Sequence, residues 1–360
     1  MREDRSMTPS IAPPSGQIDT KPASPGKTTR PRAAFLLDPA SQALIYGPQE
    51  IEELRTLTVL SEVVIPFKEW SRHRDVLAEA EVIFSGWSAP LMDEDFLRAA
   101  PRLKAVFYGA GSVRYFVTPA FWDRGILVTS ASSANAVPVA EYTVGTVLLS
   151  LRHFWSRAAD AHAGEGWGDH TRPIPGSFRA TVGLLSYGAI ARTVARFLRH
   201  FDLRVVVHCP YLSAAEAAAD GVERVGLDEL FQRSDVVSVH TPVLPETIGL
   251  VNARLVSSMK PGATLINTAR GVIIAQREVE EVLRRRPDLH AVLDVTDPEP
   301  PKADDPLLAL RNVTVTSHIA GSHGRDCQRM GHYMVEELKN YLAGRPLRWQ
   351  VNREHLERMA

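Results

Sequence analysis

The sequence predicts an α/β protein that contains two doubly wound parallel sheets. Short apolar runs of strand length alternate with segments of helical periodicity along most of the chain. This alternation begins anew after an apolar stretch at about 137–154. A length of 360 residues also suits about two domains. Strands that alternate with helices of this length favour parallel sheets covered on both faces.

The first series begins after a tail. Residues 1–32 are rich in Pro, Ser, Thr and Lys, and burial there cannot offset the entropy of ordering, so we expect a disordered tail. Helices are expected at 49–57 and 91–99. The apolar runs that predict strands are 34–37, 62–65, 82–85, 105–108 and 126–129.

The second series follows an expected helix at about 137–154. Its strands are centred near Val182, Val205, Val236, Leu265, Val292 and Val313. Helical periodicity returns at about 326–342, and the chain ends in a polar tail.

Composition argues against several classes of function. A net charge of -1 offers no field for nucleic acid or an anionic membrane, and the apolar runs are too short or too interrupted to span a bilayer. Two cysteines, Cys209 and Cys327, cannot form a disulfide framework, and no apolar signal core follows Met1. We expect a cytoplasmic protein.

Three residues late in the chain carry the strongest chemical signal. Arg270, Glu299 and His318 each follow a predicted strand. Ligands of an open parallel sheet bind outside the carboxyl ends of its strands, so these side chains are expected to converge. A fixed cation, a carboxylate and an imidazole can together bind an anion and move a proton, as a dehydrogenase of 2-hydroxy or 2-oxo acids requires.

The turn from Ser186 to Ala191 joins a predicted strand to an amphipathic helix. A pyrophosphate can meet backbone N–H groups at the positive end of such a helix. The dinucleotide fingerprint is G-x-G-x-x-G/A; Gly188 keeps the middle glycine, whereas Ser186 replaces the first and must adopt a less comfortable backbone conformation. Taken alone, the turn is equally compatible with an ordinary strand–helix connection.

The residue after the next strand bears on which dinucleotide is bound. An NAD enzyme normally carries Asp or Glu there for the ribose hydroxyls, but this chain has Cys209, a poor acceptor. No clear arginine stands nearby for the 2′-phosphate of NADP. NAD and NADP both stay open, with NAD slightly favoured.

Several ordered blocks resemble the D-isomer-specific 2-hydroxyacid dehydrogenases, which include phosphoglycerate dehydrogenase and glyoxylate/hydroxypyruvate reductase. The resemblance covers about residues 104–344. It is densest in 239–249 (VHTPVLPETIG), 259–271 (MKPGATLINTARG), 293–300 (LDVTDPEP) and 316–321 (TSHIAG).

The resemblance implies a flavodoxin-like substrate domain at 33–134 plus 320–345, a Rossmann cofactor domain at 135–319, and a tail at 346–360. It further implies a site in a cleft between the domains, closure of which excludes water, and a homodimer built around the cofactor domain.

The family pattern also implies residue roles. Arg270 would hold the substrate carboxylate in a bidentate fork. His318 would be the acid/base, and Glu299 beside it would favour the imidazolium form. Asp297 is the rival for the carboxylate's role, and a structural ion pair or a solvated loop acid is the plain alternative for Arg270 or Glu299.

The remaining roles implied by the resemblance involve no metal. The substrate loop is Gly109–Ser112, in which Ala110, Gly111 and Ser112 would bind the carboxylate; Trp87 and Arg114 would shape the pocket or merely pack, and Arg114 could favour a second acidic group. Asp294 would accept a bond from the carboxamide or cap local backbone. The cofactor residues are Ser186, Gly188, Ala189, Ile190, Cys209, Pro210, Tyr211, His240, Thr241, Pro242, Thr247, Thr268, Ala269, Arg270, Asp294, His318 and Gly321.

The leading hypothesis is a nicotinamide-dependent reductase of a small 2-oxo acid that gives the D-2-hydroxy acid. One alternative is a dehydrogenase of a small anion, similar to phosphite or formate dehydrogenases. Another class is a dinucleotide-sensing binding protein similar to the C-terminal-binding-protein corepressors, with which Ser186 and Cys209 are compatible.

Overall fold

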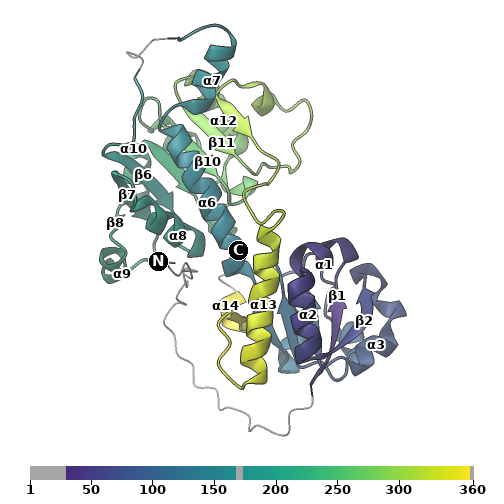
Figure 1. Cartoon of the computed structure of the whole chain (residues 1–360). Coiled ribbons are helices and arrows are strands. Elements are labelled where there is room, and N and C mark those ends of the chain that lie inside the picture. Colours follow the sequence, from purple (N-terminus) through teal and green to yellow (C-terminus); the bar gives the residue numbers. More distant parts are fainter. Residues whose placement is uncertain (1–29, 168–172, 357–360) are drawn as a thin grey trace, which may run out of the picture. The chain divides into compact units, whose positions relative to one another are not determined.

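A computed structural model of the chain describes residues 30–167 and 173–356 (Figure 1). Its residues form two compact units. The first contains the described residues up to Ala131 together with Gly331–Arg353, and the second contains Ser132–Met330 and the described residues from Glu354. The tail predicted at 1–32 lies outside the described residues except for its last three.

The first unit contains a six-stranded sheet with the order β13-β5-β4-β3-β1-β2. Strands β1 to β5 run parallel, and β13 joins β5 in the antiparallel direction. The central strands β3 and β4 are buried at every position, which explains why they read as continuous apolar runs. The strands are β1 (Arg32–Leu36), β2 (Val59–Ile65), β3 (Val82–Ser85), β4 (Ala105–Tyr108), β5 (Leu127–Ser130) and β13 (Gln350–Val351).

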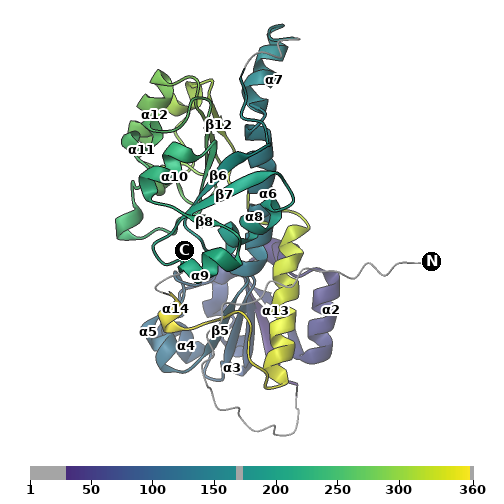
Figure 2. The same ribbon diagram turned by 90° about the vertical axis from the view of Figure 1, so that its left-hand side faces the viewer.

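Helices pack on both faces of this sheet. Asp93 caps α4 and Thr118 caps α5, each accepting a hydrogen bond from a backbone N–H of the first turn. Figure 2 shows α13 beside the sheet, and the Lys339 ammonium pairs with Glu53 of α2 at 2.5 Å. The helices are α1 (Pro39–Ile45), α2 (Pro48–Leu57), η1 (Phe67–Arg72), α3 (Arg74–Glu79), α4 (Glu94–Ala99), α5 (Pro119–Asp123) and the greater part of α13 (Asp326–Leu342).

The second unit contains a seven-stranded parallel sheet with the order β12-β11-β10-β9-β6-β7-β8. The strands are β6 (Ala180–Leu185), β7 (Leu203–His208), β8 (Glu223–Arg224), β9 (Val236–Val239), β10 (Thr264–Asn267), β11 (His290–Leu293) and β12 (Val313–Val315).

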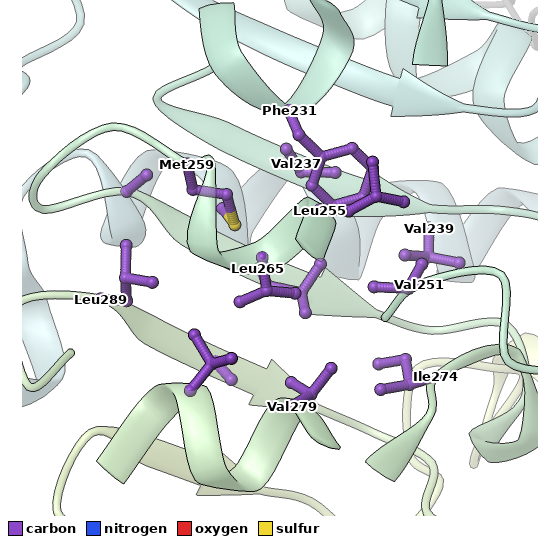
Figure 3. Packing of buried hydrophobic residues seen from close by; sticks show 14 of the residues in the cluster. Phe231, Val237, Val239, Val251, Leu255, Met259, Leu265, Ile274, Val279 and Leu289 are labelled. Carbon is purple, nitrogen blue, oxygen red and sulfur yellow. The ribbon is translucent and has the colours of Figure 1, made fainter. Parts of the chain in front are cut away.

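Two apolar clusters cover the two faces of this sheet. Leu265 of β10 packs in a cluster with residues of α10, α11 and α12 (Figure 3), whereas its neighbour Ile266 packs in the other with residues of α6 and α8. Successive strand residues therefore point to opposite, equally apolar layers, as in a doubly wound sheet. The helices are α6 (Ser132–Ser150), α7 (Phe154–His162), α8 (Ala189–Leu198), α9 (Ala214–Ala219), α10 (Leu227–Arg233), η2 (Pro245–Thr247), α11 (Ala253–Ser257), η3 (Gly271–Ile273), α12 (Gln276–Arg285) and η4 (Pro306–Ala309), and α14 (Arg353–Leu356) ends the described chain.

Two expectations about helices and the C-terminal end need correction. The helix expected at 137–154 begins and ends earlier, at Ser132–Ser150, because His153 takes a left-handed conformation (φ 51) before α7 starts. The polar tail contributes β13, since Ser130 N–H donates to the Trp349 carbonyl beside it. Within 30–167 and 173–356, no helix is long and apolar enough to cross a membrane.

Candidate active site

Three neighbouring strands of the second unit bring Arg270, Glu299 and His318 to one edge of the sheet. Arg270 follows β10, Glu299 lies beyond β11 and His318 follows β12, and these strands are adjacent. Backbone hydrogen bonds continue past the strand ends: Asp294 N–H donates to Asn267 O and His318 N–H to Asp294 O, both at 3.0 Å. The three segments thus form one connected layer at the carboxyl edge.

The imidazole of His318 contacts a carboxylate. His318 Nδ1 lies 2.5 Å from Glu299 Oε1, and both side chains are about half exposed, at 48% and 40%. Asp297, the rival candidate, uses its backbone N–H to donate to Gln276 Oε1, while the ion pair of His318 is made by Glu299. Because Nδ1 faces the carboxylate, Nε2 is the ring nitrogen that can exchange a proton with a substrate.

Asp294 holds the turn on which His318 sits. Its carboxylate is 2% exposed and accepts hydrogen bonds from Ile319 N–H at 2.8 Å and Ala320 N–H at 2.9 Å. It also accepts from the Thr316 hydroxyl at 2.6 Å. His318 itself has φ 57, a left-handed conformation that costs a side chain about 1–2 kcal/mol. The buried carboxylate therefore sustains a strained turn that aims the imidazole.

Asn267 stabilises the turn that carries Arg270. Its fully buried amide accepts from Ala269 N–H and donates to the Arg270 carbonyl, both at 2.9 Å, so it closes the turn after β10. The Arg270 guanidinium is exposed and donates through Nη1 to Ala269 O at 2.6 Å. Among the described residues, no acid lies within ion-pair distance of it, so the structural ion pair considered for Arg270 is not formed.

Gly271, the residue after Arg270, allows two of these loops to pack in direct contact. A Cβ atom on Gly271 would lie 2.0 Å from the carbonyl oxygen of Thr296, so only glycine permits the approach. The Thr296 hydroxyl in turn donates to Pro298 O at 2.8 Å. The segment that carries Arg270 is therefore packed directly on the loop that leads to Glu299.

The fingerprint turn lies where the order of the sheet reverses. Strand β6 is flanked by β9 and β7, which places its carboxyl end at the switch point that binds ligands in such sheets. Ser186 has φ 75, so it does adopt the left-handed conformation that a glycine would take without strain. Its hydroxyl donates to Thr241 Oγ1 at 3.1 Å. Gly188 is the N-cap of α8, and a Cβ atom there would meet nothing within 4 Å.

These features fit a dinucleotide. Open space above Gly188, a helix N-terminus without a side-chain cap, and the first-turn residues Ala189 and Ile190 together suit a pyrophosphate. Thr247 donates to Pro242 O at 2.7 Å and so shapes the loop that follows His240 and Thr241.

Buried polar atoms without partners point to the same group. Both ring nitrogens of His240, at the end of β9, and the hydroxyl of Thr268, at the end of β10, are buried without a hydrogen-bond partner. Burial lowers the pKa of His240 to about 4, so the ring is neutral at pH 7. Unsatisfied buried groups usually mark a place that a ligand or water completes.

The second strand of the dinucleotide fold ends at Cys209. This thiol is partly exposed, and Tyr211 beyond Pro210 is 84% exposed. In the first turn of α8, Arg192 pairs with Glu216 at 3.1 Å and with Asp220 at 2.7 Å. Its guanidinium is therefore already paired with two carboxylates.

The predicted substrate loop belongs to the first unit. Its backbone is held from β5, because Ser130 Oγ donates to Gly111 O at 2.5 Å and Ala131 N–H donates to Ala110 O at 2.9 Å. Ser112 follows, partly exposed. The loop is thus a fixed turn at the carboxyl edge of β4.

Sequence reasoning missed several residues that shape the site. Asn267, Gln276 and Asn135 were not singled out, although Asn135 Oδ1 accepts from Ser322 N–H at 2.9 Å and lies 3.3 Å from where a Cβ of Gly321 would be. Of the two roles considered for Asp294, the structure shows the one in which its carboxylate caps local backbone N–H groups. Asn267 could have been recognised from the sequence, because it is a polar residue at the end of an apolar run.

Residues 144–320 match the family described as D-isomer specific 2-hydroxyacid dehydrogenase, NAD binding domain. The chain is 32% identical over 267 residues to D-3-phosphoglycerate dehydrogenase of Archaeoglobus fulgidus, covering 74% of this chain and 50% of that one. It is 32% identical over 255 residues to (S)-sulfolactate dehydrogenase of Chromohalobacter salexigens, covering 71% and 82%.

A solved structure gives the same fold. The apo form of Rhodotorula graminis D-mandelate dehydrogenase superposes with a TM-score of 0.75 at 23% identity, covering 90% of this chain and 98% of that one. The chain spans about half the length of the phosphoglycerate dehydrogenases it matches, but most of the length of the sulfolactate dehydrogenase. It belongs to the D-isomer-specific 2-hydroxyacid dehydrogenase family.

Proposed function

We propose that the protein transfers a hydride between a nicotinamide dinucleotide and a small 2-oxo acid, interconverting it with the D-2-hydroxy acid. The observation that carries this proposal is the contact between Glu299 and His318 at the strand edge that also bears Arg270. A carboxylate-paired imidazole beside an exposed guanidinium can bind an α-oxo carboxylate and move one proton.

In the direction of reduction, His318 starts as the imidazolium. Glu299 stabilises that charge at Nδ1, and Nε2 donates its proton to the carbonyl oxygen of the substrate. A nicotinamide dinucleotide held at the turn of Gly188 and beside His240 and Thr268 would supply the hydride for the carbonyl carbon. In oxidation the neutral Nε2 takes the hydroxyl proton. Arg270 holds the carboxylate through two parallel N–H···O bonds, which fixes the carbonyl for attack.

We infer a preference for NAD over NADP. Cys209 offers no strong acceptor to the ribose hydroxyls, but Arg192 of α8 is already paired with Glu216 and Asp220 and is therefore not free to bind a 2′-phosphate. The expected outcome is a higher kcat/KM with NADH than with NADPH.

The test is nicotinamide absorbance decay with glyoxylate, hydroxypyruvate, pyruvate, phenylpyruvate and 2-oxoglutarate, each with NADH and NADPH. His318→Ala is expected to lower kcat by about 10²–10⁴-fold while dinucleotide affinity changes little, because the ring acts on the proton. His200→Ala, which removes an exposed imidazole beyond the C-terminal end of α8, is the matched control. Full activity of His318→Ala would refute the mechanism.

The same assay distinguishes the proposed reductase from a second candidate, a dinucleotide-sensing binding protein. The strained backbone of Ser186, and a thiol at position 209 where an NAD enzyme normally has a carboxylate, suit an altered dinucleotide site. Tight dinucleotide binding without turnover of any 2-oxo acid would favour the sensor. Reduction of the dinucleotide by phosphite would instead favour the small-anion dehydrogenase.

We also propose a homodimer formed through the second unit. Large apolar side chains are exposed along α7 and the segment after it: Phe154 (48%), Trp167 (80%) and Phe178 (70%). The same unit has a groove of about 570 Å³ lined by residues of α7 and of the loops that precede β9, β10, β11 and β12. Exposed apolar patches of this kind mark association sites, and a second copy of the chain is the occupant proposed. Sedimentation that gives only the monomer mass would contradict this.

We place the protein in the cytoplasm. Its two cysteines, Cys209 and Cys327, are both unpaired, as is usual in a reducing compartment. Fractionation of cells that express the tagged chain would test this placement.

A further inference from the structure

Ser186 stands where the dinucleotide fingerprint has its first glycine, and its side chain makes a contact that glycine could not make. Its φ of 75 lies in the left-handed region, which only glycine enters without strain. The Ser186 hydroxyl donates to Thr241 Oγ1 at 3.1 Å and so links the turn after β6 to the turn after β9. Strained residues that persist in a fold cluster at ligand sites, which directs attention to what this hydroxyl does.

The backbone of the turn is held without the help of that side chain. Ser186 N–H donates to His208 O, at the end of β7, at 2.8 Å. On the other side of β6, His240 N–H donates to Leu185 O at 3.0 Å. Backbone hydrogen bonds to both neighbouring strands therefore close the turn, and the serine hydroxyl is not required for that purpose.

Thr241 is the second member of a hydroxyl pair, formed by Ser186 Oγ and Thr241 Oγ1. The threonine is 3% exposed, whereas Ser186 is partly exposed. Thr241 Oγ1 accepts from Ser186 and donates to Leu185 O at 3.3 Å, the longer of the two bonds. Because Leu185 O also accepts from His240 N–H, it keeps a partner when the threonine hydroxyl turns away.

The hydrogen bond of the hydroxyl pair can therefore reverse its direction. A hydroxyl group carries one hydrogen and two lone pairs and rotates to suit its neighbours. When Thr241 donates to Ser186 Oγ instead, the hydrogen of Ser186 is released, and Leu185 O is still satisfied by the backbone. The partly exposed serine then offers one O–H donor to a ligand, and donors are what an anion requires.

The surroundings of Ser186 suit a phosphate group. Gly188 caps α8 without a side-chain bond, and a Cβ atom there would meet nothing within 4 Å. Residues 186–191 (SYGAIA) include no acid that would repel an anion. On β10, the neighbour of β9, the Thr268 hydroxyl is buried without a partner, which independently marks this edge of the sheet as one that a ligand completes.

We propose that the Ser186 hydroxyl, oriented by Thr241, donates a hydrogen bond to the pyrophosphate of the nicotinamide dinucleotide. This inference rests on the proposed function, which requires that the chain bind such a dinucleotide. The side-chain donor offsets the strained backbone that serine imposes at a glycine position. Thr241 is a positioning residue, because it acts on the ligand through Ser186.

The test is isothermal titration calorimetry of the intact protein with NADH and with ADP-ribose, which carries the pyrophosphate but no nicotinamide. Ser186→Gly and Ser186→Ala should each raise the Kd of both ligands by roughly tenfold or more, because a hydrogen bond to a charged group is lost. In urea unfolding, Ser186→Gly should have the higher midpoint of the two variants, since a φ of 75 suits glycine. Affinity thus follows the hydroxyl, whereas stability follows the backbone.

Variants of Thr241 test its role as a positioning residue. Thr241→Val keeps the shape of the side chain but removes its hydroxyl, and should raise the Kd of ADP-ribose by roughly threefold. In the background of Ser186→Gly the same change should have little effect, because Thr241 then has no hydroxyl to orient. Thr241→Ser, which keeps the hydroxyl, should restore wild-type affinity. Equal effects of Thr241→Val in both backgrounds would overturn the positioning role.

Arg179→Gly is the matched control for the change of backbone. Arg179 has φ 61 and immediately precedes β6, whereas Ser186 immediately follows it. The substitution places glycine at a left-handed residue of the same unit and leaves the hydroxyl pair in place. The Kd of NADH and that of ADP-ribose should both be unchanged.

Two results would overturn the proposal while leaving the proposed function in place. One is a Kd that is unchanged or lower in Ser186→Gly, which would mean that the serine is merely tolerated. The other is a loss of affinity for NADH without a loss for ADP-ribose, since the pyrophosphate is common to both ligands. A wild-type protein that binds neither NADH nor NADPH would instead contradict the proposed function, and this proposal with it.

Discussion

Replacing Gly271 by alanine is the sharpest test of how the site is assembled. A Cβ atom needs at least 3.0 Å from its neighbours and would have 2.0 Å to Thr296 O and 2.6 Å to Asp297 N. The two backbones must therefore separate by at least 1.0 Å, the difference between 3.0 and 2.0 Å. Neither neighbour is a flexible side chain that could rotate away.

The displacement acts at once on the two segments that carry the proposed catalytic residues Arg270 and Glu299. Arg270 precedes the glycine, and Glu299 lies three residues beyond Thr296. A misplacement of about 1 Å costs about 10²-fold in rate, so we expect kcat/KM to fall by that factor in Gly271→Ala. Overpacking should also lower the free energy of unfolding by about 1–3 kcal/mol.

The assay pairs steady-state kinetics with urea unfolding. Gly226→Ala is the matched control, because Gly226 has φ -68 and a Cβ atom there would meet nothing within 4 Å. Its rates should be unchanged and its free energy of unfolding should fall by no more than about 1 kcal/mol, because alanine is a poorer N-cap residue than glycine. If Gly271→Ala loses stability but keeps its kcat/KM, the contact does not position Arg270 and Glu299. If neither quantity changes, the close approach itself is wrong.

Three further variants test separate parts of the site. Asp294→Asn replaces a carboxylate that accepts hydrogen bonds from two backbone N–H groups by an amide, so the turn that carries His318 should loosen. The expected result is a decrease of kcat by about 10²-fold with dinucleotide affinity nearly intact. An unchanged kcat would show that the turn forms without the carboxylate. Cys209→Asp should raise the ratio of kcat/KM for NADH to that for NADPH by about tenfold or more, because a carboxylate accepts from the ribose hydroxyls; an unaltered ratio would mean that position 209 does not meet the ribose. Burial lowers the pKa of His240 to about 4 in the folded protein, whereas its pKa in the unfolded chain is about 6.5. Between these two pH values the unfolded chain binds more protons than the folded protein. The free energy of unfolding therefore decreases as the pH falls through this window, by about 2 kcal/mol at pH 5. Urea unfolding at pH 7 and pH 5 measures this effect: between these pH values the free energy of unfolding of His240→Leu should decrease by about 2 kcal/mol less than that of the wild type. Equal decreases would contradict the lowered pKa of His240.

The sequence by itself determined the fold class and the family. Runs such as 82–85 and 105–108 are apolar at every position because both faces of a central parallel strand are buried, and this holds regardless of the partner strand. Arg270 and His318 were found for a similar reason: they come directly after strands, and the carboxyl ends of parallel strands meet at one edge. The unfavourable conformation at Ser186 was also foreseen, since the turn type depends on local chain geometry.

Only the tertiary structure decided how those residues are held. Asn267, Asp294 and Gly271 act on backbone atoms that lie 2 to 26 residues away in the chain, and no local pattern records such distances. Strand β13 pairs with β5 although only two residues take part, too few to leave a periodic signal. The bond between Tyr115 and the loop of Trp87 likewise spans 26 residues. Periodicity reports what each segment buries, whereas the contacts that aim a side chain arise between segments, and these exist only once the chain has folded.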